Sequence, residues 1–398
     1  MQKVLVLCSN YEPSQFPKKP DETGRFYTYG FGGSFGKLFK KHLKGYEIEI
    51  WRLDSYCEND YYERNIDGFK YRVFKSIRIP KIGHFSRKFL SALKKEYRET
   101  DPLLFIVHTH NWQTYQVLFF LKNAKIITTH HGEWSPHFVY KNTSGLRKLR
   151  ALMGIFAEKI VLKNVNHFLL GDLRQIDYIR KTVPDLNYTL FSSGLDFDAI
   201  KPISKPEARK LLGWDQEKEY ILYVGKLYKY KQVDELIKIW NEIKITRSNV
   251  ELVLVGNEAR GSWGEEYYDF AQESGAMIIG RVLNTELYRY YCAADVYVLL
   301  GLREDNFGGT GIAPLESLAC NTPVISNTMR NYLGTNADEI CEMPNTLEEY
   351  KDAILDALDH KEKFKNMREN VEKYYSREAV VRRIEIVFNN VLKSKEEK

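Results

Sequence analysis

The sequence predicts an α/β protein of two doubly wound, Rossmann-like domains that face each other across a cleft. Short runs of β-branched and apolar residues alternate with amphipathic segments of helix length along the chain. This alternation is typical of a parallel sheet covered by helices on both faces. It pauses once, near residue 193, and a second series of the same kind follows a segment with two prolines. Because such sheets bind ligands at the carboxyl ends of their strands, we expect the binding crevice between the two domains.

The first series of strands and helices lies in residues 1–196, which we assign to an N-terminal Rossmann-like domain. Its expected strands are residues 3–8, 47–53, 104–108, 126–129 and 167–170, and its expected helices are residues 34–43, 85–98 and 146–162.

The second series begins after a linker that we place at residues 197–206, where Pro202 and Pro206 stiffen the chain. Residues 207–375 then form a C-terminal Rossmann-like domain. The remaining residues, 376–398, contain a helix that we expect to cross back to the N-terminal domain. The strands expected in the second domain are residues 219–225, 251–256, 276–280, 296–301 and 323–326.

Composition sets the broad class of protein. With 398 residues and 43% hydrophobic residues, the chain is long enough for two ordinary cores. No apolar run approaches the roughly 20 residues of a membrane span, so we expect a cytoplasmic protein. The five cysteines are scattered and never spaced as C-x-x-C, which indicates reduced thiols.

The glycine-dense segment at 308–326, GGTGIAPLESLACNTPVIS, is the strongest functional signal. Its glycines allow close approach of a ligand, and a helix that starts near Thr310 offers unpaired N–H groups to a diphosphate. Glu316, two turns into that helix, is placed to bind a ribose hydroxyl pair. The alternative is an ordinary glycine-rich loop with Glu316 facing water. The donor-binding residues proposed for this segment are Gly308, Gly309, Thr310, Gly311 and Ile312.

Two lysines lie on the loop that follows the first strand of the second domain. Gly225 ends that strand, and Lys226 and Lys231 follow it at the sheet edge where ligands bind. Two cations there could clamp a diphosphate, although a solvated basic patch remains the alternative.

These segments resemble the retaining glycosyltransferases of family 4, which have the GT-B fold. GKLYKYKQ at 225–232 resembles the family's Gly-Arg-x5-Lys-Gly, and residues 308–326 resemble its GFGLxxLEAMACGTPVI. SGLD at 193–196 resembles its Asn-Gly-Val-Asp. The resemblance implies a retaining, hexosyltransferase-like glycosyltransferase that moves a sugar from a nucleotide-diphosphate sugar to a hydroxyl acceptor.

The resemblance also implies roles for single residues. Lys226, in place of the family's arginine, and Lys231 would hold the donor diphosphate, and Glu316 matches the second glutamate of a Glu-x7-Glu motif that binds the ribose. The first glutamate falls on Gly308, a departure from the pattern. Glu304 or Asp305 could replace it, or the backbone N–H groups of the loop could serve alone.

In the N-terminal domain, Thr129-His130-His131-Gly132 resembles the family's Thr-x-His-Gly, so His131 would reach the transferred sugar. Gly32 and Gly33 would let the backbone approach the donor phosphates or the acceptor. His108 and His110 fall on one face of a strand, and structural roles are favoured over a metal site because further ligands are not evident. We expect no metal and no cofactor.

The sequence offers no matched pair of carboxylates of the kind that retaining hydrolases use. We therefore expect the acceptor hydroxyl to attack on the face from which the phosphate departs, with that phosphate taking the proton. His131 would orient the sugar.

The acceptor is a glycan, a lipid-linked glycan or a small molecule. Residues 146–162 combine Leu, Met, Ile and Phe with basic residues, which suits peripheral contact with the anionic inner face of a membrane. The alternative is that the apolar residues pack on the sheet and the lysines are ordinary solvated groups. No nucleic-acid module is recognisable. The basic residues of this helical region are Arg147, Lys148, Arg150, Lys159 and Lys163.

Two other functions remain open at this point. One is a nucleotide-sugar epimerase on the same fold, which would need acid and base carboxylates in the cleft. The other is a non-catalytic protein that binds a nucleotide sugar or a glycan, and the missing first glutamate favours it.

Overall fold

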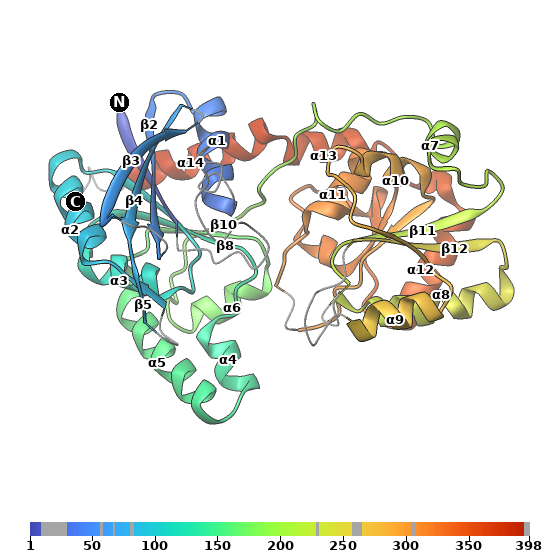
Figure 1. Ribbon diagram of the computed structural model, residues 1–398, viewed down its shortest axis with the longest axis horizontal. Coiled ribbons are helices and arrows are strands. Elements are labelled where there is room, and N and C mark those ends of the chain that lie inside the picture. Colours follow the sequence, from blue (N-terminus) through green and yellow to red (C-terminus); the bar gives the residue numbers. More distant parts are fainter. Residues whose placement is uncertain are drawn as a thin grey trace. The chain divides into compact units, whose positions relative to one another are not determined.

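The computed structural model divides the chain into two compact units, which are described separately (Figure 1). Unit 1 comprises Met1–Phe191 and Val380–Lys398, and unit 2 comprises Ser192–Ala379. The division falls a few residues before the expected boundary at 196, and the expected linker, 197–206, lies within unit 2. The structure describes residues 1–8, 30–55, 59–66, 68–79, 83–227, 231–256, 265–304 and 307–393.

Within the described ranges, unit 1 contains an eight-stranded sheet in the order β10-β9-β8-β7-β1-β2-β4-β3. Neighbouring strands are parallel, except for the antiparallel pair β3 and β4 at one edge. A separate antiparallel pair, β5 and β6, lies outside this sheet. The strands are β1 (Gln2–Cys8), β2 (Tyr46–Asp54), β3 (Tyr61–Ile66), β4 (Phe69–Lys75), β5 (Ile77–Ile79), β6 (Gly83–Phe85), β7 (Leu103–Val107), β8 (Lys125–His130), β9 (His167–Leu170) and β10 (Tyr188–Leu190).

Helices cover both faces of this sheet, as β1 illustrates. Val4 and Val6 join a core with α1 and α14, whereas Leu5 and Leu7 join a second core with α2 and α3, because successive side chains of a strand point to opposite faces. The last helix therefore completes the core of unit 1. The helices are α1 (Gly30–His42), α2 (Arg87–Thr100), α3 (Trp112–Phe120), α4 (Pro136–Asn142), α5 (Gly145–Val161), α6 (Arg174–Arg180) and α14 (Arg377–Lys393).

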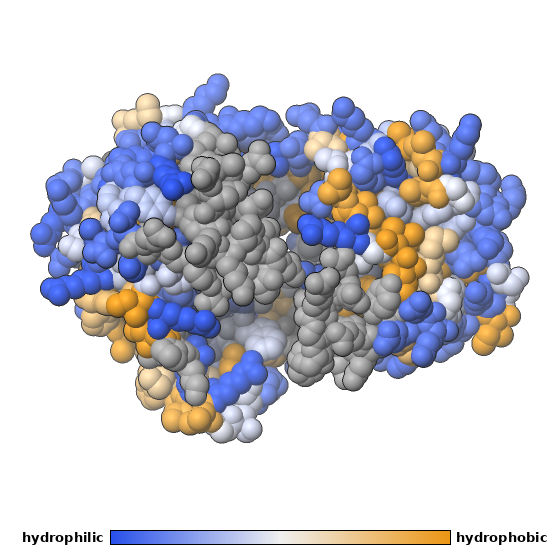
Figure 2. Space-filling view, in the orientation of Figure 1, coloured by the Kyte–Doolittle hydropathy of each residue, from blue (hydrophilic) through white to orange (hydrophobic). Residues whose placement is uncertain are grey.

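The outer face of α5 differs from the surface of an ordinary amphipathic helix. Five large apolar side chains on it are between 53% and 74% exposed, so the expectation that the apolar residues of this segment all pack on the sheet is wrong for them. Figure 2 shows hydrophobic and strongly hydrophilic residues close together on the part of unit 1 where Figure 1 places α4 and α5. No helix in the described part of the chain is long and apolar enough to cross a membrane. The five exposed residues are Leu146, Leu149, Met153, Phe156 and Ile160.

The described part of unit 2 contains a six-stranded parallel sheet in the order β13-β12-β11-β14-β15-β16. The chain builds outward from β11 in one direction and then returns to add β14 on its other side. The point of reversal, where a doubly wound sheet binds its ligand, therefore lies at the carboxyl ends of β11 and β14. The strands are β11 (Glu219–Val224), β12 (Val250–Val255), β13 (Met277–Gly280), β14 (Val296–Val298), β15 (Val324–Ile325) and β16 (Cys341–Glu342).

The helices of unit 2 pack with these strands into one continuous core. Its largest fully buried side chains include Trp240, Tyr220 and Tyr350. The architecture of both units confirms the predicted α/β class with Rossmann-like parallel sheets. The helices are α7 (Lys205–Leu212), α8 (Val233–Thr246), α9 (Glu265–Glu273), α10 (Leu287–Ala293), α11 (Ile312–Ala319), α12 (Leu347–Asp359) and α13 (Met367–Tyr375).

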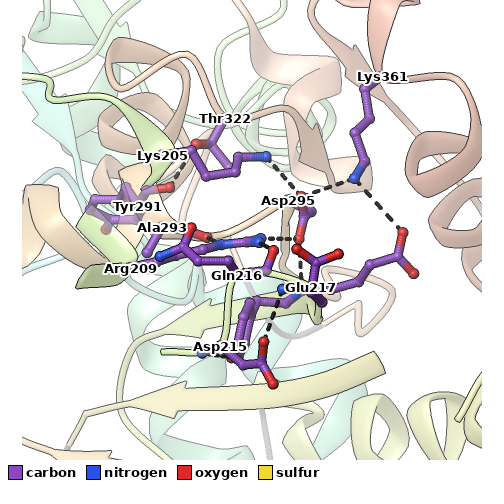
Figure 3. A network of polar contacts seen from close by, with 12 residues as sticks. Lys205, Arg209, Asp215, Gln216, Glu217, Tyr291, Ala293, Asp295, Thr322 and Lys361 are labelled. Carbon is purple, nitrogen blue, oxygen red and sulfur yellow. Dashed lines mark hydrogen bonds and ion pairs between the residues drawn. The ribbon is translucent and has the colours of Figure 1, made fainter. Parts of the chain in front are cut away.

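A buried carboxylate, Asp295, ties the start of β14 to its surroundings (Figure 3). It is 3% exposed and accepts hydrogen bonds from Arg209 at 2.7 Å, Lys205 at 2.8 Å and the Tyr220 main-chain N–H at 2.8 Å. Lys361 adds an ion pair at 3.0 Å. Burial alone would raise the pKa of Asp295, but the neighbouring cations and the N–H bond hold it below its ordinary value.

The two chain segments that leave unit 2 for unit 1 lie side by side. Leu195 forms an isolated parallel bridge with Ser376, and its main-chain N–H donates to the Tyr375 carbonyl oxygen at 2.8 Å. Asp196 pairs with Arg377 on the same segments. Main-chain pairing and an ion pair therefore join the two segments that connect the units.

Candidate functional site

Two glycines shape the sheet edge of unit 2 where β11 and β12 end. Gly256 has φ of 152°, and a Cβ atom there would lie 1.7 Å from the carbonyl oxygen of Gly225. Since no side chain fits that space, the two backbones meet directly, and the Gly225 N–H donates to the Val255 carbonyl oxygen at 2.9 Å. This packing leaves the start of the lysine loop close to the sheet.

Lys226 and Lys231 both lie on the loop that leaves β11. The Tyr223 hydroxyl donates to the Lys226 carbonyl oxygen at 2.9 Å, while the Lys226 side chain is exposed. Lys231 is half-buried, and burial, together with the positive charge of Lys226, lowers its pKa. A bound anion would offset both the burial of the Lys231 charge and its repulsion by Lys226, so this pair of cations suits an anionic ligand.

The loop that follows β14 reaches the same edge. Its Arg303 main-chain N–H donates to the Gln232 side-chain oxygen at 3.1 Å, directly before α8 begins at Val233. Because β11 and β14 are adjacent parallel strands, the lysine loop and the glycine-rich turn leave the sheet next to each other. The glycine-rich turn and the lysine loop therefore start from the same edge of the sheet.

The glycine-rich turn leads into α11, which begins at Ile312, close to the start expected near Thr310. Gly309 and Gly311 have φ of 63° and 81°, so both positions need glycine. Thr310 is buried, and its carbonyl oxygen accepts a hydrogen bond from the Thr328 hydroxyl at 3.2 Å. The turn thus connects the edge to the start of α11, where the first N–H groups of a helix have no acceptor within the helix itself.

The first glutamate of the Glu-x7-Glu motif falls on Gly308, and Glu304 or Asp305 was considered as its replacement. Gly308 and Glu304 are both exposed, and Glu304 lies in a turn. Asp305, the other replacement considered, lies outside the described residues. The replacement stays a prediction.

Glu316, on α11, is half-buried rather than facing water. The Tyr291 hydroxyl of α10 donates to its Oε2 atom at 2.9 Å. Burial raises the pKa of Glu316, although the bond from Tyr291 opposes that shift. Tyr291 therefore holds one carboxylate oxygen of Glu316 in place. Sequence reasoning missed Tyr291, since its contact with Glu316 is purely tertiary.

In unit 1, a second group of polar residues lies where β7 and β8 end. Glu133 accepts hydrogen bonds from the His131 N–H at 2.7 Å and the Thr109 N–H at 2.8 Å, one on each carboxylate oxygen. His108, with φ of 78°, approaches Glu133 at 3.5 Å. Burial would raise the pKa of Glu133, but the histidines around it, His130 first, hold it well below its ordinary value. Sequence reasoning missed this carboxylate.

His131 lies beside that carboxylate in an aromatic setting. Its Nε2 atom lies 2.8 Å from the Thr129 hydroxyl, and its ring centroid is 5.7 Å from those of Phe35 and Phe191. Burial lowers the pKa of His131 to about 3, so the imidazole is neutral at neutral pH. Phe35 also brings α1 to this site. Gly32 and Gly33 lie in the first turn of α1, which starts at Gly30, before the expected residue 34.

The remaining histidines have structural partners. His130 is buried and bonds to the Glu133 carbonyl oxygen at 2.8 Å, and buried His110 contacts Glu158 at 2.6 Å. The Tyr115 hydroxyl donates to the same Glu158 oxygen at 2.5 Å. Among the described residues, no group of three His, Cys, Asp or Glu is placed to hold a metal ion. Metal independence stays a prediction.

Two α/β units, each built on a mostly parallel sheet, are the architecture of the GT-B fold, which solved glycosyltransferases share. Sucrose-phosphate synthase from Thermosynechococcus elongatus shares the fold with a TM-score of 0.70 at 18% identity, covering 99% of this chain and 100% of that one. The Anabaena protein HepE, solved with UDP and glucose, gives 0.62 at 12% identity and covers 98% and 100%.

Sequence comparison gives a family match within unit 2. Residues 204–374 match the family model of the glycosyl transferases group 1. An uncharacterized glycosyltransferase of Methanocaldococcus jannaschii is 22% identical over 363 residues, covering 84% of this chain and 88% of that protein. A D-inositol 3-phosphate glycosyltransferase of Corynebacterium aurimucosum is 24% identical over 237 residues, covering 56% and 55%.

Another uncharacterized glycosyltransferase of Methanocaldococcus jannaschii is 22% identical over 227 residues, covering 50% of this chain and 57% of that protein. The chain thus spans little more than half the length of two of these relatives.

Proposed function

We propose that the protein is a retaining, hexosyltransferase-like glycosyltransferase that moves a sugar from a nucleotide-diphosphate sugar to a hydroxyl acceptor. The observation that carries this proposal is the edge of β11 and β14, where the lysine loop follows β11 and the loop after β14 leads into α11, the helix that carries Glu316. An anion and a hydroxyl pair, side by side, are the two parts of a nucleotide diphosphate that these groups suit. The match of residues 204–374 to the glycosyl transferases group 1 supports the same reaction class.

In this proposal the diphosphate binds Lys226, Lys231 and the N–H groups of Gly309–Ile312. Glu316 binds the ribose through the oxygen that Tyr291 does not occupy. UDP-sugars are the first donors to consider, because the structurally similar HepE was solved with UDP and glucose.

The reaction forms a bond between the acceptor oxygen and the anomeric carbon and breaks the bond from that carbon to the diphosphate. The acceptor proton passes to the departing phosphate oxygen. Lys226 and Lys231 stabilise the charge that develops on the leaving group, so no metal is needed for it. A neutral His131 suits contact with an oxocarbenium-like sugar, because a protonated ring would repel the developing positive charge.

Glu133 is a positioning residue rather than a nucleophile. Both of its oxygens already accept main-chain hydrogen bonds, and its low pKa makes it a weak base. Those bonds and the low pKa make this carboxylate a poor nucleophile for a double displacement. The geometry therefore favours attack on the same face as the leaving group.

The acceptor class proposed is a glycan, a lipid-linked glycan or a small molecule with a free hydroxyl. A non-catalytic binder and an epimerase make different predictions. A binder leaves the donor intact, whereas an epimerase changes its sugar without an acceptor.

The decisive experiment is calorimetric titration of UDP-, GDP- and ADP-sugars, in EDTA, into wild type and Lys231→Ala. Loss of a charge-assisted phosphate contact should weaken binding about 10- to 100-fold. Lys238→Ala, an exposed lysine on α8 paired with Glu235, is the matched control and should leave affinity unchanged. Absence of binding by every donor, or equal binding by Lys231→Ala, would contradict the proposal, as would loss of affinity caused by EDTA alone.

Turnover then separates the enzyme from its alternatives. With the donor identified, a set of hydroxyl acceptors should yield a glycoside whose anomeric configuration, read by NMR, matches that of the donor. Donor binding without product from any acceptor would favour the binder.

A further inference from the structure

α5 has two opposite apolar faces, and only one of them serves the fold. The inward face is buried and includes Gly154, Ile155 and Val161. The outward residues recur at steps of three and four, which places them on a single stripe about half a turn away from the buried face. A soluble surface helix normally carries polar residues there, so this stripe requires its own explanation. The stripe, called the outer α5 face below, comprises Leu146, Leu149, Met153, Phe156 and Ile160.

Basic residues border the outer α5 face on both sides. From the helical repeat, Lys148 and Lys159 fall along one border and Arg150 along the other, and all three are exposed. The acidic residue within α5, Glu158, points inward to His110 and Tyr115. The exposed part of α5 therefore carries cations and apolar groups but no carboxylate.

Aromatic residues from the preceding segment extend this surface. Trp134 and Tyr140 are 40% and 38% exposed. Arg147 lies over the Trp134 ring at 5.5 Å, and Lys148 lies over the Tyr140 ring at 4.7 Å. Indole and phenol rings beside Lys and Arg are the side chains enriched at membrane–water interfaces.

A pocket of about 230 Å³ lies beyond the Arg150 border of this face, where Ala151 and Gly154 of the buried face also line it. Trp112 and Trp134 line it together with Arg147 and Arg150. Two guanidinium groups at the rim of an apolar pocket suit an anionic headgroup, because guanidinium binds phosphate in a bidentate manner.

We propose that the outer α5 face docks unit 1 on a bilayer that contains anionic lipids, with a lipid phosphate at the Arg147 and Arg150 pocket. A bilayer satisfies both features at once, since its interior takes the apolar stripe and its charged surface takes the flanking cations. A second copy of the same face would bring like charges together at both borders. The inference goes beyond the proposed sugar transfer and does not rest on it.

The test is flotation of the full chain with vesicles of phosphatidylcholine alone or mixed with phosphatidylglycerol. Wild type should float with the mixed vesicles and not with the neutral ones, and high salt should release it. Leu149→Ser combined with Phe156→Ser should reduce the partition coefficient at least tenfold. Lys148→Gln and Lys159→Gln should each reduce it about fivefold.

The control is Ile245→Ser, which removes an 84% exposed apolar residue from α8 of unit 2 and should not change flotation. All variants should have the melting temperature of wild type, because the substituted side chains are exposed. Equal flotation of the double variant, or equal binding to neutral vesicles, would overturn the proposal. So would a dimer in sedimentation that the double variant abolishes. Calorimetric donor binding on the same variants reports separately on the sugar site.

Discussion

Replacing Asp295 with alanine should destabilise unit 2 severely, although Asp295 is no part of the proposed donor site. The side chain is the common acceptor of Arg209, Lys205, Lys361 and the Tyr220 N–H (Figure 3). Alanine would leave Arg209, only 5% exposed, with its charge uncompensated.

The size of the effect follows from that geometry. Breaking a buried pair by removing one partner costs about 3–5 kcal/mol. The orphaned Tyr220 N–H raises the cost, since an unmet buried donor costs about 1–3 kcal/mol. Arg209 keeps its hydrogen bonds to the carbonyl oxygens of Ala293 and Gln216, and these bonds reduce the cost of removing Asp295. We therefore expect a loss of about 3–5 kcal/mol rather than more.

The assay is urea-dependent hydrogen exchange, read on peptides from β11 and β14, because the two units need not unfold together. The control, Lys351→Ala, breaks exposed pairs with Glu348 and Glu242 and should have little effect. Asp295→Leu combined with Arg209→Met should cost less than Asp295→Ala. A loss for Asp295→Ala no larger than the control's would refute the reasoning.

The same carboxylate should make unit 2 sensitive to acid. The pKa of Asp295 is lower in the folded protein than its unfolded value of about 3.9. Its stabilisation is therefore complete above that unfolded value and is lost as pH falls through the folded pKa. Wild type should show this acid-dependent loss, and Asp295→Ala should lack it.

Three further predictions concern the two candidate sites. Glu133→Gln should slow transfer about 10- to 100-fold through misplacement of His131, with donor affinity measured by calorimetry unchanged; a change in affinity alone would be contrary. Tyr291→Phe should raise the pKa of Glu316 further, so the pH below which donor binding weakens should move upward in titrations at several pH values; an unmoved pH profile would exclude this coupling. Gly256→Ala should lower both melting temperature and donor affinity, since its Cβ atom would collide with the backbone of the neighbouring strand; wild-type melting would disprove it.

Most of the parallel strands were predictable because their residues are largely apolar and buried, whereas the short edge strands β10 and β16 were not expected. β7 is apolar at each position, which is how such a strand reads in a sequence. β3, at the edge of the sheet, and β4, next to it, were not expected, because their polar and charged residues interrupt the apolar pattern and make both segments resemble loop. The start of α1 was missed because Gly32 and Gly33 lower helix propensity.

The site was predictable where chemistry follows the chain closely. Lys231 and Glu316 carry their signal in local spacing, whereas Tyr291 reaches Glu316 only through the packing of two helices. Glu133 lies two residues after His131, yet whether a carboxylate turns back to accept main-chain N–H groups depends on the loop conformation. The sequence of α5 likewise contains apolar residues on two faces without indicating which of the two is buried.

α14 determines when the core of unit 1 can be completed during synthesis of the chain. Synthesis starts at the N-terminus, so residues 1–191 leave the ribosome long before the side chains that complete their core exist. Domains usually fold in the order of their synthesis. Here the contiguous unit 2 can close first, while unit 1 waits with Phe39 and Phe105 uncovered until Phe388 arrives. A premature stop codon before residue 380 would remove the α14 side chains from this core, so it would destabilise unit 1 although residues 1–191 would still be made.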